Sequence, residues 1–222
     1  MSNDQPDVVA DDVVVNAGAV DLPGFLAVPA DARGLVVFAH GSGSSRHSPR
    51  NRQVADVLER AGFATLLFDL LTADEAQDRA NVFDVGLLAD RLVNVEHWTR
   101  AQPSLAALPT GFFGASTGAC AALGAAAMAP SNVFAVVSRG GRPDLAGELL
   151  PQVEAPTLLL VGEKDETVLE LNRTAQERLR CRSHLEVIPG AGHLFEEPGA
   201  LTAVAEAARD WFVDELAQSS PS

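Results

Sequence analysis

The stretch GFFGASTGAC, residues 111–120, decides the fold. Its apolar first half predicts a buried strand, and the alanine-rich residues that follow predict a helix, so Ser116 falls on a direct strand-to-helix turn. Such a turn brings together the residues two positions before and after the serine, and Gly114 and Gly118 avoid the resulting clash. The pattern therefore predicts a nucleophile elbow that leaves the Ser116 hydroxyl exposed at the end of the strand.

Strand-like and helix-like segments alternate on both sides of this turn. The opening segments, DDVVVNAG and VDLPGFLAVPA, predict an antiparallel pair, and the later strand-like segments are nearly continuous apolar runs. Such runs are typical of strands buried on both faces of a parallel sheet. The pattern predicts the α/β class: a doubly wound, mostly parallel sheet flanked by helices, with no large cap domain. The expected parallel strands are 34–40, 63–69, 110–116, 133–139, 155–162 and 184–190, and the expected helices begin near 49, 84, 117, 168 and 199.

Length and composition fit one domain, 1–222, in which about 1–8 and 217–222 are expected to be frayed. The net charge of −14 repels phosphate backbones and anionic lipid, so we expect neither nucleic acid nor a membrane as a partner. Two cysteines give no disulfide framework, and the acidic N-terminus lacks the apolar core of a secretory signal. These features predict a cytoplasmic protein. The sequence carries no indication of its oligomeric state.

A serine nucleophile needs a base, and the base needs an acid that orients it. In doubly wound sheets, sites form at the carboxyl ends of the strands. Asp165 comes shortly after the expected strand that ends at Gly162, and His193 follows the next strand. The chain order Ser116, Asp165, His193 is the one that α/β-hydrolase architectures use. We therefore predict that these three residues form a catalytic triad.

Asp144 is a second candidate for the acid, because it follows the preceding strand within SRGGRPD and some proteins of this architecture place the acid there. Asp165 lies directly on the expected loop and is the favoured choice. Cys120 stands one helical turn after Ser116 and is expected to be a small buried residue. No Cys/His spacing indicates a metal site.

The transition state of acyl transfer needs hydrogen-bond donors for an oxyanion. One expected donor is the backbone N–H of Thr117, the residue after the nucleophile. The other is the backbone N–H of Ser42, in the loop AHGSGSSRHSPRN that follows the strand 34–40. His40 is expected to be structural, with a ring hydrogen bond that fixes this loop.

The chain resembles α/β hydrolases of the dienelactone-hydrolase-like group over essentially its full length. The resemblance is carried by HGSGSSRHSPRN, FDVGLLADRL, GASTGA, VSRGGRPDLA, LLLVGEKDETV and GAGHLFEEPGAL. It implies hydrolysis of esters or related acyl compounds by a Ser-Asp-His triad, without a metal or an organic cofactor. True dienelactone hydrolases carry cysteine as the nucleophile, whereas the elbow residue here is Ser116. This departure leaves acyl-transfer chemistry intact but weakens any inference that the substrate is a dienelactone.

The predicted function is a serine hydrolase that cleaves carboxylic esters of small, short-acyl substrates. A thioesterase, a lactonase or an acyltransferase would use the same residues, and a non-catalytic binding protein that retains the fold is the alternative from another class. Arg139 and Arg142 are candidate ligands for an anionic substrate group, with pairing to local carboxylates as the other interpretation, and His47 is a candidate for the pocket rim. Only loops are expected to cover the site. The interval between Arg139 and Thr157 has room for a loop and a short helix such as LAGELL, and the polar segment 71–83 is the other candidate cover.

Overall fold

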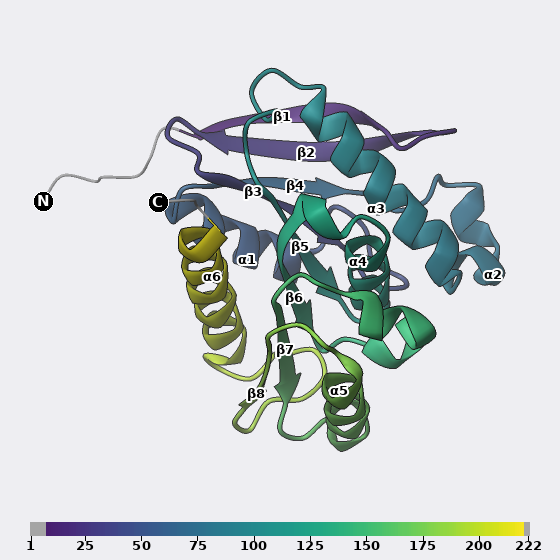
Figure 1. Ribbon diagram of the computed structural model, residues 1–222, viewed down its shortest axis with the longest axis vertical. Coiled ribbons are helices and arrows are strands. Elements are labelled where there is room, and N and C mark those ends of the chain that lie inside the picture. Colours follow the sequence, from purple (N-terminus) through teal and green to yellow (C-terminus); the bar gives the residue numbers. More distant parts are fainter. Residues whose placement is uncertain (1–7, 220–222) are drawn as a thin grey trace, which may run out of the picture.

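The computed structural model describes residues 8–219, which form an eight-stranded sheet with helices on both faces (Figure 1). The strand order is β1-β2-β4-β3-β5-β6-β7-β8. β1 and β2 are antiparallel to each other, β2 is antiparallel to β4, and the remaining neighbours are parallel. The predicted class and the antiparallel opening pair are therefore confirmed. The strands are β1 (Val8–Asn16), β2 (Asp21–Pro29), β3 (Gly34–Ala39), β4 (Phe63–Phe68), β5 (Thr110–Ala115), β6 (Val133–Arg139), β7 (Thr157–Gly162) and β8 (Ser183–Ile188).

The sheet separates two apolar cores. The helices α1 and α6 pack on one face, and α3, α4 and α5 pack on the other (Figure 1). β3, β4, β5 and β7 are buried along their whole length, which explains why their sequences are continuously apolar rather than alternating.

The helical elements are α1 (Pro49–Arg60), η1 (Glu75–Gln77), α2 (Arg79–Val82), α3 (Val85–Arg100), α4 (Thr117–Met128), η2 (Pro130–Asn132), η3 (Pro143–Gln152), α5 (Glu166–Arg178) and α6 (Ala200–Ser219).

The helix that follows Ser116 is almost entirely buried. α4 consists mainly of alanine and glycine, so α3 and the sheet can approach its backbone closely. A Cβ atom added to Gly124 would lie 3.0 Å from the Cβ atom of Ala89 in α3. This close packing fixes the position and direction of α4, and with it the turn at Ser116.

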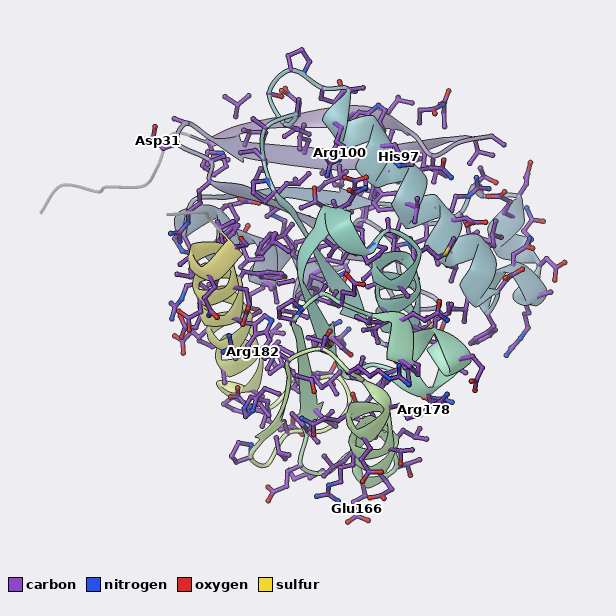
Figure 2. All side chains as sticks on the ribbon, in the orientation of Figure 1. Asp31, His97, Arg100, Glu166, Arg178 and Arg182 are labelled. Carbon is purple, nitrogen blue, oxygen red and sulfur yellow. The ribbon has the colours of Figure 1, made fainter. Side chains whose placement is uncertain are left out.

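No large cap covers the carboxyl edge of the sheet within residues 8–219. The segment 71–83, expected to be a loop, contains the short helices η1 and α2, and only η3 stands between β6 and β7. Arg178 of α5 lies beside η3 (Figure 2), where its guanidinium is 2.9 Å from the Glu148 carboxylate. The elements η1, α2 and η3 are thus short, and an ion pair connects η3 to α5.

The two ends of the described chain lie in regular elements. β1 begins at Val8 and α6 continues to Ser219, so these residues, expected to be frayed, belong to the fold. The rest of the segments expected to be frayed, 1–7 and 220–222, lies outside the described residues. Between residues 8 and 219, no helix has the length and apolar character that crossing a membrane requires.

Candidate active site

Ser116 occupies the strained turn that the sequence predicts. It has φ 53° and ψ −120°, in a region that side-chain-bearing residues rarely adopt, between the end of β5 and the first residue of α4. Its N–H donates to the Arg139 carbonyl (3.1 Å), and its carbonyl accepts from the N–H groups of Ala119 and Arg142 (both 3.1 Å). These three backbone bonds hold the strained conformation in place.

The two glycines of the motif are required by contacts of the backbone. A Cβ atom on Gly114 would lie 2.4 Å from the Cα atom of Ala119, and one on Gly118 would lie 2.1 Å from the Ala39 carbonyl oxygen. Both distances are far below a normal contact, and the obstructing atoms are backbone atoms that have no room to move. Glycine at these positions thus lets β5 turn directly into α4 beside the end of β3.

Asp165 and His193 form a pair at the ends of the next strands. Asp165 follows β7 and precedes α5, and its carboxylate oxygen Oδ2 lies 2.6 Å from Nδ1 of His193 in the loop after β8. The aspartate side chain is only 15% exposed and the histidine side chain 40% exposed. This arrangement leaves the other ring nitrogen, Nε2, as the one able to exchange a proton with a substrate or a nucleophile.

The end of β6 links this pair to the serine. Arg139 accepts the hydrogen bond from Ser116 N–H, and the next residue, Gly140, lies against the histidine. A Cβ atom on Gly140 would be 3.3 Å from the Phe195 ring and 3.6 Å from His193 Nδ1. Ser116 and His193 therefore flank the same short stretch of backbone.

Two glutamates that the sequence analysis did not assign to the site hold the histidine loop. Glu197 accepts hydrogen bonds from Gly192 N–H (3.0 and 3.1 Å), and this bond lowers the pKa of the Glu197 carboxyl. Glu163 accepts from Gly190 N–H (2.7 Å) and so ties the loop after β7 to the loop after β8. Their proximity to the triad candidates in GEKDE and HLFEE was the only signal in the sequence.

The two residues predicted to supply the oxyanion donors, Ser42 and Thr117, are in contact. Thr117 is the first residue of α4, so its N–H is one of the helix donors that have no intrahelical acceptor. The backbone N–H of Ser42, however, donates to Oγ1 of Thr117 (2.8 Å). Gly41 lies against the serine, since a Cβ atom there would be 3.7 Å from Ser116 Oγ. The loop after β3 thus reaches the nucleophile candidate, and Ser42 N–H is already engaged by the Thr117 hydroxyl.

His40 fixes this loop through both ring nitrogens. Nε2 accepts from Leu70 N–H (3.1 Å), so Nδ1 carries the proton and donates to the Gly41 carbonyl (3.0 Å). Burial lowers the pKa of His40, despite the opposing effects of the Gly41 carbonyl and the Asp69 charge. The expected structural role of His40 is confirmed.

This neutral histidine gives a pH prediction. Because the folded-state pKa lies below the ordinary value of 6.5, the unfolded chain binds more protons, and stability is lost as the pH falls through about 6.5. His40→Gln keeps an acceptor for Leu70 N–H but cannot titrate. Urea unfolding at a series of pH values is expected to show a weaker loss of stability on acidification in this variant than in the wild type. His184→Gln, at an exposed position, is the control, and indistinguishable profiles of His40→Gln and the wild type would contradict the prediction.

Asp144, the rival acid, has a different partner. Both of its carboxylate oxygens bind the Arg142 guanidinium, at 2.8 and 2.7 Å. Arg142 is therefore satisfied within the protein, as the interpretation of local pairing expects. Arg139 differs, because no carboxylate of residues 8–219 pairs with it, and its Nη1 atom is buried without a hydrogen-bond partner.

A pocket of about 220 Å³ opens beside the elbow on the α3 side of the sheet. The segment 71–83 forms one wall, and Glu75 anchors that wall through its ion pair with the buried Arg91 (2.6 Å). His47 is not among the lining residues, and its ring packs edge-on against Phe25 at 5.1 Å. The lining residues are His40–Ser45, Asp69–Ala73, Ala76, Val82, Leu88 and Thr117.

Cys120 is buried as expected, and burial raises the pKa of its thiol to about 12. The thiol is therefore protonated at neutral pH and is a poor nucleophile. No group of three or more His, Cys, Asp or Glu side chains is arranged to hold a metal ion in the part of the chain that the structure describes. Cys120, with its protonated thiol, is therefore no rival to Ser116 as the candidate nucleophile.

The mostly parallel sheet, the strained serine turn and the loops at its carboxyl edge define an α/β hydrolase. The model of the dienelactone hydrolase family matches residues 22–216, and the chain belongs to this family. The crystal structure of a dienelactone hydrolase from Anabaena variabilis is 55% identical, with a TM-score of 0.90 over 95% of this chain and 98% of that one. The structure of Est1E from Butyrivibrio proteoclasticus is 17% identical, with a TM-score of 0.78 over 93% of this chain and 99% of that one, which shows the fold alone.

Another relative with a similar sequence carries a different functional name. A Mycobacterium tuberculosis protein described as a putative phosphoribosyl transferase is 61% identical over 217 residues, which are 98% of this chain and 49% of that protein. The chain thus spans about half the length of the curated relatives that it matches. The name of the relative describes a protein twice as long, whereas the dienelactone hydrolase match lies within the shared part.

Proposed function

We propose that the protein hydrolyses carboxylic esters through Ser116, His193 and Asp165. The observation that carries the proposal is the 2.6 Å pair of Asp165 and His193 beside the strained turn that presents Ser116. An unassisted serine hydroxyl is a poor nucleophile, and a histidine oriented by a carboxylate supplies the base that it needs. The proposed substrate is a small molecule, and the proposed reaction uses neither a metal nor an organic cofactor.

In the proposed reaction, Ser116 Oγ attacks the ester carbonyl while His193 Nε2 takes its proton. Asp165 holds the imidazole in the tautomer with the proton on Nδ1 and stabilises the imidazolium. His193 then protonates the leaving alcohol, and an acyl-enzyme remains on Ser116. The same histidine takes a proton from water, which attacks the acyl carbonyl. As the bond to Ser116 Oγ breaks, His193 returns this proton to the oxygen, so that the acid and the free serine are released.

The proposed oxyanion hole uses the N–H groups of Thr117 and Ser42. The N–H of Thr117 also benefits from the positive end of the α4 dipole. For Ser42 to act as the second donor, its present bond to Thr117 Oγ1 has to be shared with the oxyanion or given up during the reaction. The Thr117 hydroxyl thus holds the donor near its place of action before the substrate arrives.

The pocket beside the elbow supports a preference for short acyl groups. Its volume of about 220 Å³ and its fixed 71–83 wall leave little room to bury a long chain. Each additional buried methylene would contribute only about 0.8 kcal/mol, and only while there is apolar surface to receive it.

A panel of p-nitrophenyl esters from acetate to laurate tests the activity and this preference together. We expect kcat/KM to be highest for acyl groups of roughly two to six carbons, since methylenes outside the pocket gain no burial energy. The rate should rise smoothly with substrate concentration, without activation at the solubility limit. A kcat/KM that climbs steadily to laurate would contradict the preference, and no turnover of any ester would contradict the proposed function.

Lactone hydrolysis is the second candidate, because the 55% identical structure from Anabaena variabilis is named a dienelactone hydrolase. A lactone is a cyclic ester, and the same residues would open it. Simple γ- and δ-lactones therefore belong in the panel. Higher kcat/KM for lactones than for open-chain esters of equal carbon number would identify this candidate as the better description.

A further inference from the structure

The side chain of Arg139 leaves the sheet on the face opposite the apolar pocket. Successive side chains of a strand point to opposite faces. Val137, two residues earlier in β6, belongs to the core beneath α1 and α6, so Arg139 points to the same face. Arg139 is paired in register with Ala115, the residue directly before Ser116. Its side chain therefore starts at the level of the nucleophile candidate Ser116 along the strands. It points to the α1 and α6 face of the sheet, and the pocket lies on the α3 face.

This arginine is the exception among the arginines that the fold partly buries. Arg46, Arg91 and Arg142 pair with Asp69, Glu75 and Asp144. In residues 8–219, Arg139 makes no ion pair, and its Nη1 atom is buried without a hydrogen-bond partner. Burying an unpaired cation costs free energy unless another group compensates it.

A second cation, Arg50, makes this cost larger. Arg139 is half-buried, and Arg50 stands in the first turn of α1. Desolvation by burial, followed by repulsion from Arg50, lowers the Arg139 pKa to about 10. The guanidinium nevertheless stays charged at neutral pH. Arg50 has a partner of its own, since its guanidinium lies 2.6 Å from the Glu196 carboxylate. Within residues 8–219, the fold thus provides a carboxylate for Arg50 and none for Arg139, although the net charge of the chain is −14.

We propose that Arg139, with Arg50 as a second cation, binds an oxyanion group of the substrate, a carboxylate or a phosphate, beside Ser116. A planar guanidinium donates two parallel hydrogen bonds to such a group, which would satisfy Nη1 and compensate the buried charge. The substrate then carries its apolar part toward the pocket on the α3 side and its anion toward α1. The placement of the anion relative to the ester rests on the proposed function, whereas the anion site itself does not.

Anion binding is tested without turnover. Thermal unfolding is followed with increasing sodium phosphate, and separately with sodium benzoate, at constant ionic strength set by sodium chloride. We expect at least one of the two anions to raise the Tm of the wild type in a saturable manner, and not that of Arg139→Met. Methionine keeps the unbranched apolar stem and removes an uncompensated cation, so this variant should fold. Arg60→Met removes the same charge from an exposed position at the end of α1 and should respond like the wild type.

Substrate recognition is tested with three acetate esters: phenyl acetate, 4-acetoxybenzoate and 4-acetoxyphenyl phosphate. They share the acyl group and differ in the charge on the released phenol, so they also distinguish a carboxylate from a phosphate. In Arg139→Met, the kcat/KM ratio of the preferred anionic ester to phenyl acetate should fall about 10- to 100-fold, the range expected for a lost charge-assisted hydrogen bond. Arg139→Lys should recover part of the ratio, because it restores the charge without the planar fork.

The two arms separate the anion site from the proposed function. Saturable anion binding that Arg139→Met abolishes, in a protein that hydrolyses no ester, would support the site and overturn the function. Ester turnover with no saturable anion effect, or with the same effect in Arg139→Met, would overturn the site and leave the function standing. An unchanged selectivity ratio in Arg139→Met would overturn recognition of the substrate by this arginine.

Discussion

Ser116→Ala is expected to lower kcat for p-nitrophenyl butyrate by roughly 10⁴- to 10⁶-fold, the range seen when the nucleophile of other Ser-His-Asp enzymes is removed. The substitution deletes the atom that forms the acyl-enzyme, and alanine adopts the φ of 53° with no greater strain than serine. The fold should survive, because the backbone bonds of residue 116 to Arg139, Ala119 and Arg142 do not involve the hydroxyl. Steady-state kinetics combined with circular dichroism measures both outcomes.

Three further measurements make this expectation specific. A serine-directed phosphonate should label Ser116 and no other residue, as peptide mass spectrometry would show. Ser104→Ala, at an exposed position in the segment before β5, should keep wild-type kinetics. His193→Ala should lose about as much activity as Ser116→Ala, because the two residues act as one unit. Near-wild-type turnover by Ser116→Ala, or labelling at another serine, would remove Ser116 from the mechanism.

The sequence was sufficient to predict the sheet and the turn because both depend on local patterns. Continuous apolar runs identify strands buried on both faces, as in β3, β4, β5 and β7. Gly114 and Gly118 mark the place where β5 turns directly into α4. The strand order was not predicted, because it depends on contacts between residues far apart in the chain. The helices η1 and α2 were missed because the segment 71–83 is polar and has no apolar periodicity. An ion pair from Glu75 to the distant Arg91 holds this segment in place.

The site was predictable to the extent that strand ends are predictable. Ser116 and His193 follow strands, and so do both candidate acids. The sequence favoured Asp165 over Asp144 only because Asp165 lies on the loop where the acid is expected. The structure distinguishes the two aspartates by their partners: Asp144 binds Arg142, and Asp165 contacts His193. The engagement of Ser42 N–H by Thr117 and the missing partner of Arg139 were also unpredictable, because each is a property of side chains brought together by folding.

Asp165→Asn is expected to lower kcat by about 10⁴-fold, as the equivalent change does in other triads. An asparagine in place of Asp165 can turn its NH₂ group toward His193 Nδ1, which leaves the proton on Nε2. In that tautomer the imidazole cannot accept the proton of Ser116. The carboxylate that would stabilise the imidazolium is lost as well. Circular dichroism and the Tm should stay close to wild type, because the backbone bonds of Asp165 to Gly162 and Leu169 remain.

Asp144→Asn is the matched control for the same chemical change, and the comparison decides which aspartate is the acid. Its expected cost in kcat is less than about 10-fold, because the ion pair with Arg142 is partly exposed, and exposed pairs contribute little to stability. The bond from Arg142 N–H to the Ser116 carbonyl comes from the backbone and should persist without the Asp144 carboxylate. If Asp144→Asn were the more damaging change, the acid would have to act from the β6 side, and the pair of Asp165 and His193 would be structural. A loss confined to Asp165→Asn would instead identify the Asp165 carboxylate as the group that holds His193 ready to take the Ser116 proton.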